Sequence, residues 1–376
     1  MKLPTEWKYP IDVTVDYRLP ENREYLVMAW IETLSYTTEM DQQLRLMNWS
    51  IDRDHDGDIE RKLWLAFLWG CCYNSIGPWT IMHSFPTPPK DMGEFADWYN
   101  EIFDKMRFDT DCRYRKSKMI ACIQSYMDWL DGRTQQEAYQ SIFDESDHIK
   151  QYELIWETCM SWKYYGRLSA WNCVEAVALV TGWKHGIDCQ SFMLDDRTGS
   201  ESNRNGACFI NDREDLLTKH GKLKSTGVPI ELSDCLMLEE KTEALCQRVM
   251  NEFNHIATHN RLNMETSLCC WPKKMFRERN TRYVGWDSER TYDELVYMAE
   301  HWPDVPLEPL YAARQQFLPD ILRCEDAPEG VVRGVDKRKM SVFFLTGTPW
   351  HILKLQMGER WVIMDEKKSH KTRKLW

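Results

Sequence analysis

The fold is decided by long apolar stretches such as residues 59–73, which read IERKLWLAFLWGCCY. A stretch of this length and apolar content predicts a buried helix. Helical spacing of apolar residues recurs along most of the chain. We expect further helices at residues 23–47, 95–106, 116–130, 149–162, 169–180, 234–255, 288–301 and 307–322. Gly182 is expected to cap the end of the helix at 169–180.

Strand-like patterns are few and lie near the C-terminus, at residues 341–345, 352–355 and 361–364. The sequence therefore predicts a mainly α fold. We expect a helical body, with a DNA-glycosylase-like arrangement as one alternative, together with a long central functional loop and a small C-terminal β element. We expect the helical catalytic body to span residues 1–330. A sub-boundary near 86–89 and a single undivided helical body are equally good predictions. A β appendage with a basic tail is expected at 331–376.

The overall composition is that of a globular protein, with 43% hydrophobic and 28% charged residues among 376. No apolar run has membrane-spanning length, and residues 1–10 lack the features of a signal peptide. Thirteen cysteines without a secretion signal indicate a reducing cytoplasm. The sequence contains no C-x-x-C pair, which argues against a four-cysteine zinc site.

The net charge of -11 argues against a protein that coats nucleic acid non-specifically. Basic residues nevertheless gather in four clusters, at 113–118, 273–282, 333–339 and 367–374. Such clusters suit an enzyme that contacts a few phosphates, although solvated helix faces and a tail explain them equally well.

A central segment, residues 187–229, is rich in Gly, Ser, Asn and Asp and shows little periodicity. We expect a long loop there, and loops of this length are usually functional or disordered. Residues 195–206 read DDRTGSESNRNG and contain the groups needed to hold a phosphate or pyrophosphate. The expected anion-binding residues are Gly199, Ser200, Ser202, Asn203, Arg204, Asn205 and Gly206. Asp195 and Asp196 can hold a substrate ammonium; a turn-rich connection without a ligand is an equally good interpretation.

Two further stretches carry chemically useful groups. Arg167 lies at an expected helix start, with Trp171 and Glu175 on one face of that helix. Glu265 and Cys269 precede a basic stretch that ends at 282–285. A positioned glutamate can act as a general base and a thiol as a nucleophile, although a cysteine is more often a small buried apolar group.

Two motif-like stretches are not expected to bind metal. Residues 52–59 imitate the front of an EF-hand loop, but Leu63 stands where a bidentate glutamate is required. The acidic residues there are expected to cap the following helix instead. His255 and His259 have the spacing of zinc ligands without the glutamate of a metalloprotease helix. A P-loop and a dinucleotide-binding glycine motif are both missing from the sequence.

Three blocks of the sequence resemble the phage amino acid:DNA transferases, also described as α-glutamyl/putrescinyl thymine pyrophosphorylases and related to the helical domain of phage 5-hydroxymethyluracil DNA kinases. The blocks are YGRLSAW at 165–171 with Glu175, GSESNRNG at 199–206, and ETSLC at 265–269 followed by RYVG at 282–285. Asn203 departs from the family pattern, which places a histidine before Arg-Asn-Gly. The kinase members carry a P-loop domain, so its absence here favours the transferase branch.

The resemblance implies a transferase that replaces the pyrophosphate of 5-(pyrophosphoryloxymethyl)uracil in DNA with an amino acid or polyamine. A 5-hydroxymethyluracil DNA kinase is implied as the pathway partner, and the cytoplasm of an infected bacterium as the location. The amine is a cosubstrate; no cofactor is implied, a divalent metal has no support, and no membrane is involved.

The chemistry of the implied reaction gives the residues expected roles. Glu265, Cys269 and Arg204 are the expected catalytic residues, with Glu265 as the base. Pyrophosphate and DNA are expected to contact Arg167, Trp171, Arg282, Tyr283 and the anion-binding residues of 199–206. The cosubstrate is expected at Asp195, Asp196 and Glu175. Two other functions stay open, a helical glycosylase-like enzyme that excises a base and a non-catalytic DNA-binding subunit.

Overall fold

The computed structural model describes residues 4–12, 15, 19–37, 41–182, 186–192, 201–219, 221–253, 261–271 and 286–318. Regular structure in these residues is almost entirely helical, which confirms the mainly α class. The helices of the first half are α1 (Pro20–Thr37), α2 (Gln42–Asp54), α3 (Ile59–Cys72), α4 (Ile76–Ser84), α5 (Met92–Ile102), η1 (Phe103–Lys105), η2 (Thr110–Lys118), α6 (Met119–Leu130) and α7 (Gln135–Phe143). Those of the second half are α8 (His148–Ser161), α9 (Arg167–Val180), α10 (Ser202–Ile210), η3 (Glu214–Leu216), α11 (Leu232–Glu252), α12 (Arg261–Trp271), α13 (Trp286–His301) and α14 (Glu308–Phe317).

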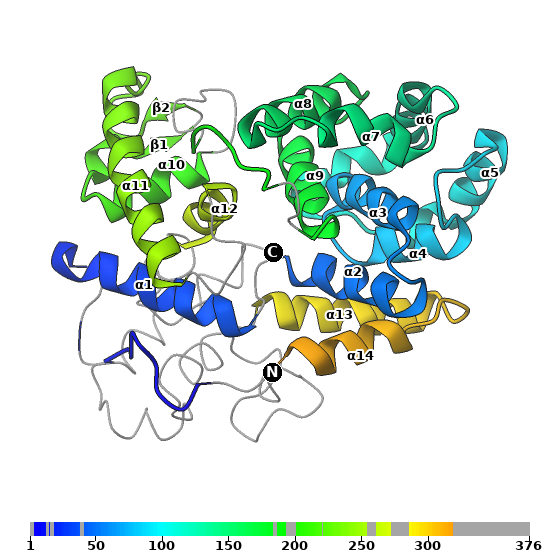
Figure 1. The fold of residues 1–376 in the computed structure, drawn as a ribbon, viewed down its shortest axis with the longest axis horizontal. Helices are drawn as coiled ribbons and strands as arrows, with labels where there is room; N and C mark the ends of the chain where they lie inside the picture. The colour runs from blue at the N-terminus through cyan, green and yellow to red at the C-terminus, as the bar shows by residue number, and fades with distance from the viewer. Residues whose placement is uncertain are drawn as a thin grey trace.

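The larger of two hydrophobic clusters forms around α3, which packs along α9. Gly70 permits this close packing, because a Cβ atom there would lie only 1.9 Å from the Tyr165 hydroxyl oxygen. The other helices from α2 to α8 surround α3 and α9, and α13 and α14 pack along α2 (Figure 1). We refer to these helices together as the large lobe.

The second cluster belongs to a small lobe made by α1, α10, α11 and α12 (Figure 1). A short antiparallel pair, β1 (Thr218–Lys219) and β2 (Lys222–Leu223), lies beside α10, with Thr218 opposite Leu223. Gly206 of α10 makes its contact with α12 possible, because an added Cβ atom would lie 2.1 Å from the carbonyl oxygen of Leu268. None of the helices in the described part of the chain is long and apolar enough to span a bilayer.

The helix boundaries correct the sequence predictions at two places. The single helix expected at 23–47 is two helices, α1 and α2, and Asp41 between them has a left-handed backbone with φ of 52°. The loop expected at 187–229 is wrong for residues 202–210, which form α10, and for the β1–β2 pair. The expected C-terminal strands and the appendage at 331–376 lie outside the described residues.

Two capping predictions are confirmed. Asp58 caps α3, its carboxylate accepting from the backbone N–H groups of Glu60 at 2.9 Å and Arg61 at 3.4 Å. Gly182 follows α9 with φ of 70° and donates its N–H to the Leu179 carbonyl. The EF-hand-like stretch therefore ends in a helix cap, as expected.

Candidate functional site

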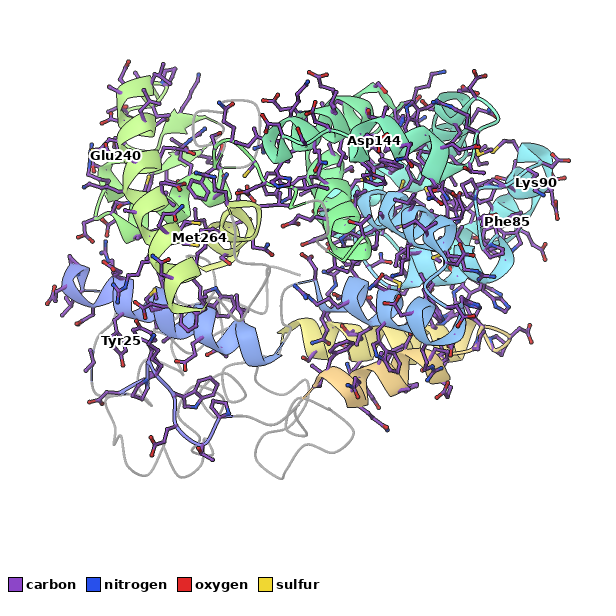
Figure 2. The ribbon with its side chains drawn as sticks, in the orientation of Figure 1. Tyr25, Phe85, Lys90, Asp144, Glu240 and Met264 are labelled. Carbon is purple, nitrogen blue, oxygen red and sulfur yellow. The ribbon has the colours of Figure 1, made fainter. Side chains whose placement is uncertain are left out.

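Helix α12 lies where the two lobes meet, and it carries the predicted base. Leu262 near its start packs in the large-lobe cluster, whereas Met264 and Leu268 pack in the small-lobe cluster. Met264 marks this helix beside α11 in Figure 2. Glu265 and Cys269 are four residues apart, so they share one face of α12.

Glu265 is a buried carboxyl in an electrostatically unusual place. Its side chain is 5% exposed. Burial raises its pKa well above the usual range, the Cys269 thiol raises it further, and the Arg167 guanidinium at the start of α9 lowers it in part. A carboxyl with a raised pKa is a stronger base once ionised, which suits proton transfer. The structure thus brings Glu265 and Cys269 together with Arg167, which precedes them by about a hundred residues in the sequence.

Cys269 differs from the other cysteines of the described residues. It is half-buried, whereas the remaining cysteines whose side chains are described are buried. Partial exposure is one condition for a reactive thiol, while a buried thiol in apolar surroundings is usually inert. Among the predicted site residues, Cys269 is therefore the described cysteine that is partly exposed to solvent.

Tyr152 of α8 lies near Glu265 of α12 and near side chains of α9. Its ring lies 6.2 Å from that of Trp171, edge to face. Burial raises the pKa of Tyr152; the nearby Cys189, Glu265 and Glu175 raise it too, and Arg167 opposes them. Sequence analysis missed this residue, because nothing distinguished it from the other tyrosines of the chain.

Glu175 of α9 interacts electrostatically with Arg45 of α2. Burial lowers the pKa of Arg45, and the carboxylates of Asp41 and Glu175 raise it. Glu175 itself is 7% exposed. We call the set Asp41, Arg45, Tyr152, Arg167, Glu175 and Glu265 the buried charge network. Glu175 and Glu265 are buried, whereas Asp41, Arg45 and Arg167 are partly buried. Charges withdrawn from water need opposite charges nearby, and the network supplies them between α2, α9 and α12.

Asp188 holds the beginning of α12 in place. Its carboxylate accepts from the Leu262 backbone N–H at 3.1 Å and pairs with Arg261 at 3.3 Å. Arg261 also makes a two-point contact with Glu243 of α11, at 2.7 and 2.9 Å. Burial raises the pKa of Asp188, while the Leu262 N–H and Arg261 lower it. These contacts anchor the helix that carries Glu265.

The second half of the predicted anion-binding segment forms the first turns of α10. Asn203 donates to the Phe192 carbonyl at 2.6 Å. Asn205 exchanges two hydrogen bonds with the backbone of Thr218, at 3.0 and 3.3 Å. Arg204 is fully buried. Gly206 places this segment directly against α12, next to Leu268 and hence one residue from Cys269.

The other predicted site residues are beyond what the structure describes. They are Asp195, Asp196, Gly199, Ser200, Arg282 and Tyr283. His255 and His259 also lie outside the described residues. Within the described part of the chain, no group of three metal-ligating side chains comes together.

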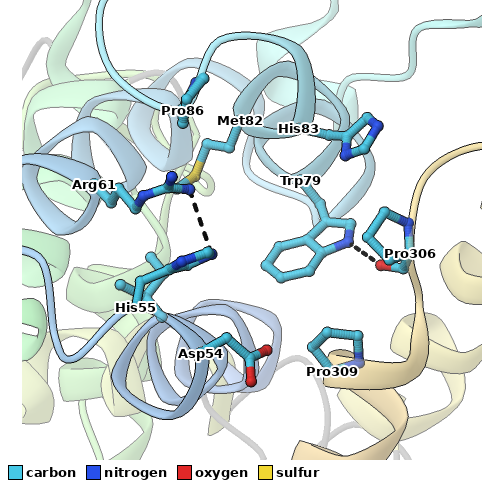
Figure 3. Close-up of a pocket in the computed structure, with 10 residues that line it drawn as sticks. Asp54, His55, Arg61, Trp79, Met82, His83, Pro86, Pro306 and Pro309 are labelled. Carbon is cyan, nitrogen blue, oxygen red and sulfur yellow. Dashed lines mark hydrogen bonds between the residues drawn. The ribbon is translucent and has the colours of Figure 1, made fainter.

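A pocket of about 320 Å³ lies elsewhere, between α2, α4 and the start of α14 (Figure 3). Its polar groups largely pair with the protein. Arg61 contacts His55 at 3.4 Å, and the Trp79 indole donates to the Pro306 carbonyl at 2.9 Å. The lining residues are Ile51, Asp54, His55, Arg61, Trp79, Met82, His83, Pro86, Pro306 and Pro309. None of the predicted site residues is among them.

Comparison with known proteins places the chain beside DNA-modifying enzymes. A family model described as amino acid:DNA transferase matches residues 38–280. A serinyltransferase of Salmonella phage ViI is 56% identical over 365 residues, which cover 95% of this chain and 89% of the relative. A search of the solved structures found no match. The matched region contains the buried charge network and the α10–α12 contact.

Proposed function

The chain belongs to the amino acid:DNA transferase family, and we propose that it attaches serine to an activated thymine derivative in DNA. Membership makes it an enzyme that transfers an amino acid to DNA in thymine hypermodification. Serine is proposed because the phage relative is a serinyltransferase. The comparisons give no support to a base-excising enzyme or a non-catalytic subunit.

The proposed reaction joins the serine amine to the exocyclic carbon of 5-(pyrophosphoryloxymethyl)uracil. The carbon–oxygen bond to pyrophosphate breaks, and its electron pair leaves with the pyrophosphate. A carbon–nitrogen bond forms in its place, and one amine proton passes to the Glu265 carboxylate. Such a step needs a positioned base and compensation of the departing negative charge.

The observation that carries this proposal is the environment of Glu265. It is buried, its pKa is raised, it shares a helix face with the half-buried Cys269, and it lies in the field of Arg167. We propose Glu265 as the base and Arg167 as a contact for the pyrophosphate. Glu175, the third charged group near Tyr152, is the described candidate for the serine ammonium. Arg204 and the glycine-rich residues before it stay candidates for further pyrophosphate contacts.

The test uses a duplex that contains 5-(pyrophosphoryloxymethyl)uracil together with isotope-labelled serine, glutamate, glycine or putrescine in separate reactions. Mass spectrometry of the nucleosides is expected to find a serine adduct, with one pyrophosphate released for each adduct formed. Abasic sites without pyrophosphate would instead identify a base-excising enzyme. An adduct with another amine alone would overturn the choice of serine.

Two variants test the base. Glu265→Gln is expected to lower the transfer rate by about a hundredfold or more, within the range typical of a general base. Glu60→Gln is the matched control, because the Glu60 carboxylate only accepts from the start of α7, at 2.9 Å from the Gln135 N–H. Transfer by Glu265→Gln at the wild-type rate would remove Glu265 from this role.

We also propose the enzyme's place in the infected cell. A kinase that phosphorylates 5-hydroxymethyluracil in DNA has to supply the activated base, because the leaving group must be installed first. Both steps act on replicated DNA, which places the enzyme in the host cytoplasm. Deleting that kinase is expected to leave 5-hydroxymethyluracil in the phage DNA and to abolish the serine adduct.

A further inference from the structure

The basic cluster at 113–118 has two parts with different roles. Arg115 is 1% exposed and uses all five of its N–H donors inside the protein. Its acceptors are the carbonyl oxygens of Gly70, Cys71 and Tyr164 and the hydroxyl oxygens of Tyr114 and Ser169. Arg115 is therefore a structural clamp. The other cations of the cluster, Arg113, Lys116 and Lys118, face at least partly outward.

The clamp fixes an unusual turn immediately before α9. Tyr164 has a left-handed backbone with φ of 63°, which is rare for a bulky residue. Its carbonyl accepts from the Arg115 Nε at 3.0 Å and from the Tyr114 hydroxyl at 3.2 Å. Yet the two tyrosine side chains stay in solvent, 46% exposed for Tyr164 and 53% for Tyr114. Because the rings are exposed, their burial does not offset the energetic cost of the left-handed backbone at Tyr164. Such strain points to a binding role rather than to a contribution to stability.

Lysine side chains lie on the same surface as these rings. The Lys118 ammonium lies 5.7 Å from the centre of the Tyr164 ring. Lys163 precedes Tyr164 and is exposed, as is Leu168 in the first turn of α9. The ion pairs between described residues include neither Lys118 nor Lys163. We call Tyr114, Lys118, Lys163, Tyr164 and Leu168 the tyrosine–lysine face.

We propose that the tyrosine–lysine face binds the DNA substrate, with Lys118 and Lys163 on backbone phosphates and Tyr164 against a base displaced from its stack. Unpaired surface cations suit phosphates, and exposed aromatic rings suit unstacked bases. The face also lies at the right place. Arg167, one residue before Leu168, is the guanidinium that acts on Glu265, so DNA on this face reaches the buried charge network from the start of α9. The proposal rests on DNA as the family's substrate and not on the pyrophosphate chemistry.

The first test measures binding rather than transfer. The double variant Lys118→Ala/Lys163→Ala of the full chain is titrated against a short fluorescent duplex of unmodified DNA at several salt concentrations. The dependence of log Kd on log salt is expected to fall by about one for each lysine removed, and the affinity by about tenfold or more at low salt. The matched control is Lys222→Ala/Lys241→Ala, two exposed lysines of β2 and α11 in the small lobe (Figure 1). A wild-type salt dependence in the first double variant, or a loss only in the control, would overturn the proposal.

The second test separates the contribution of the Tyr164 ring to DNA binding from that of its left-handed turn. Tyr164→Asn removes the ring, and asparagine tolerates the left-handed backbone better than most residues. Tyr164→Phe keeps the ring. We expect the asparagine variant to bind a duplex with one mismatched base about tenfold more weakly, and the phenylalanine variant to bind it normally. Equal binding by the two variants would remove Tyr164 from the proposal. Because both tests use unmodified DNA, failure of the transfer chemistry would leave their outcome unchanged.

Discussion

At the scale of the residue, the proposed base Glu265 predicts a specific pH dependence of the transfer rate. A base works only when ionised, so the transfer rate is expected to rise with pH through the raised pKa of Glu265. Arg167 lowers that pKa and Cys269 raises it. Arg167→Gln should therefore move the rising limb to higher pH, and Cys269→Ser should move it to lower pH. The measurement is the pH profile of kcat for each variant; shifts in the same direction would contradict the assigned electrostatics.

The same carboxyl affects stability. Because the folded-state pKa of Glu265 is above the unfolded one, folding favours its protonated form, and stability is lost as pH rises through the folded pKa. Glu265→Gln removes this loss. We expect its Tm to equal that of the wild type at a pH below the ordinary glutamate value, about 4.3, and to exceed it at alkaline pH. A lower Tm of Glu265→Gln at both pH values would show that the carboxylate stabilises the fold.

The sequence marks Gly206 as a position that requires glycine, but the structure gives a different reason for this requirement. The sequence suggests an anion-binding loop in which glycine lets the backbone expose its N–H groups. The structure instead shows that a Cβ atom added at Gly206 would lie 2.1 Å from the Leu268 carbonyl oxygen. Gly206→Ala must push α10 and α12 apart, at a cost of about 1–3 kcal/mol in the free energy of unfolding. Gly166→Ala is the control, since its nearest contact would be an ordinary 3.6 Å from the Tyr114 hydroxyl. Equal unfolding midpoints in urea would contradict the close packing.

At the scale of elements, the sequence predicts the helices whose apolar spacing is regular and misses those that tertiary contacts create. α3, α8 and α9 appear within two residues of their predicted bounds. α10 has a glycine in its middle and lies in a polar stretch, so its helical form depends on packing against α12 and the other helices of the small lobe. α7 is not among the predicted helices, although Thr134 and Glu137 form a capping box whose pattern is visible in the sequence.

The start of α12 gives the prediction at this scale. Asp188 to Ala removes both the acceptor for the Leu262 N–H and the Arg261 ion pair. Asp188→Asn keeps an acceptor and loses only the ion pair. We expect the alanine variant to lose about 1–2 kcal/mol of stability, as for a lost helix cap, and the asparagine variant less. If Asp188 positions Glu265, kcat should fall in the same order while KM for serine changes little; a change confined to KM would contradict a positioning role.

At the scale of the whole molecule, the site arises from the meeting of two hydrophobic clusters. The sequence shows the individual blocks at 165–175, 199–206 and 265–269, because each has distinctive residue types. It does not show that Tyr152, Arg45 and Asp41 join them, since long-range contacts between helices leave no local pattern. Composition also does not reveal how the chain divides into two hydrophobic clusters, because the small-lobe cluster combines α1 with residues beyond 190.

This arrangement predicts two unfolding units. Leu238 of α11 is fully buried in the small-lobe cluster, and Leu65 of α3 is fully buried in the other. Either leucine replaced by alanine should cost about 2–5 kcal/mol. Most of the tryptophans whose side chains are described lie in or against the large-lobe cluster. Leu238→Ala is therefore expected to shift the urea transition seen by far-ultraviolet circular dichroism more than the one seen by tryptophan fluorescence, and Leu65→Ala to shift the fluorescence transition. Coincident shifts of both signals in both variants would mean that the two clusters unfold as one cooperative unit, with the buried charge network strong enough to couple them.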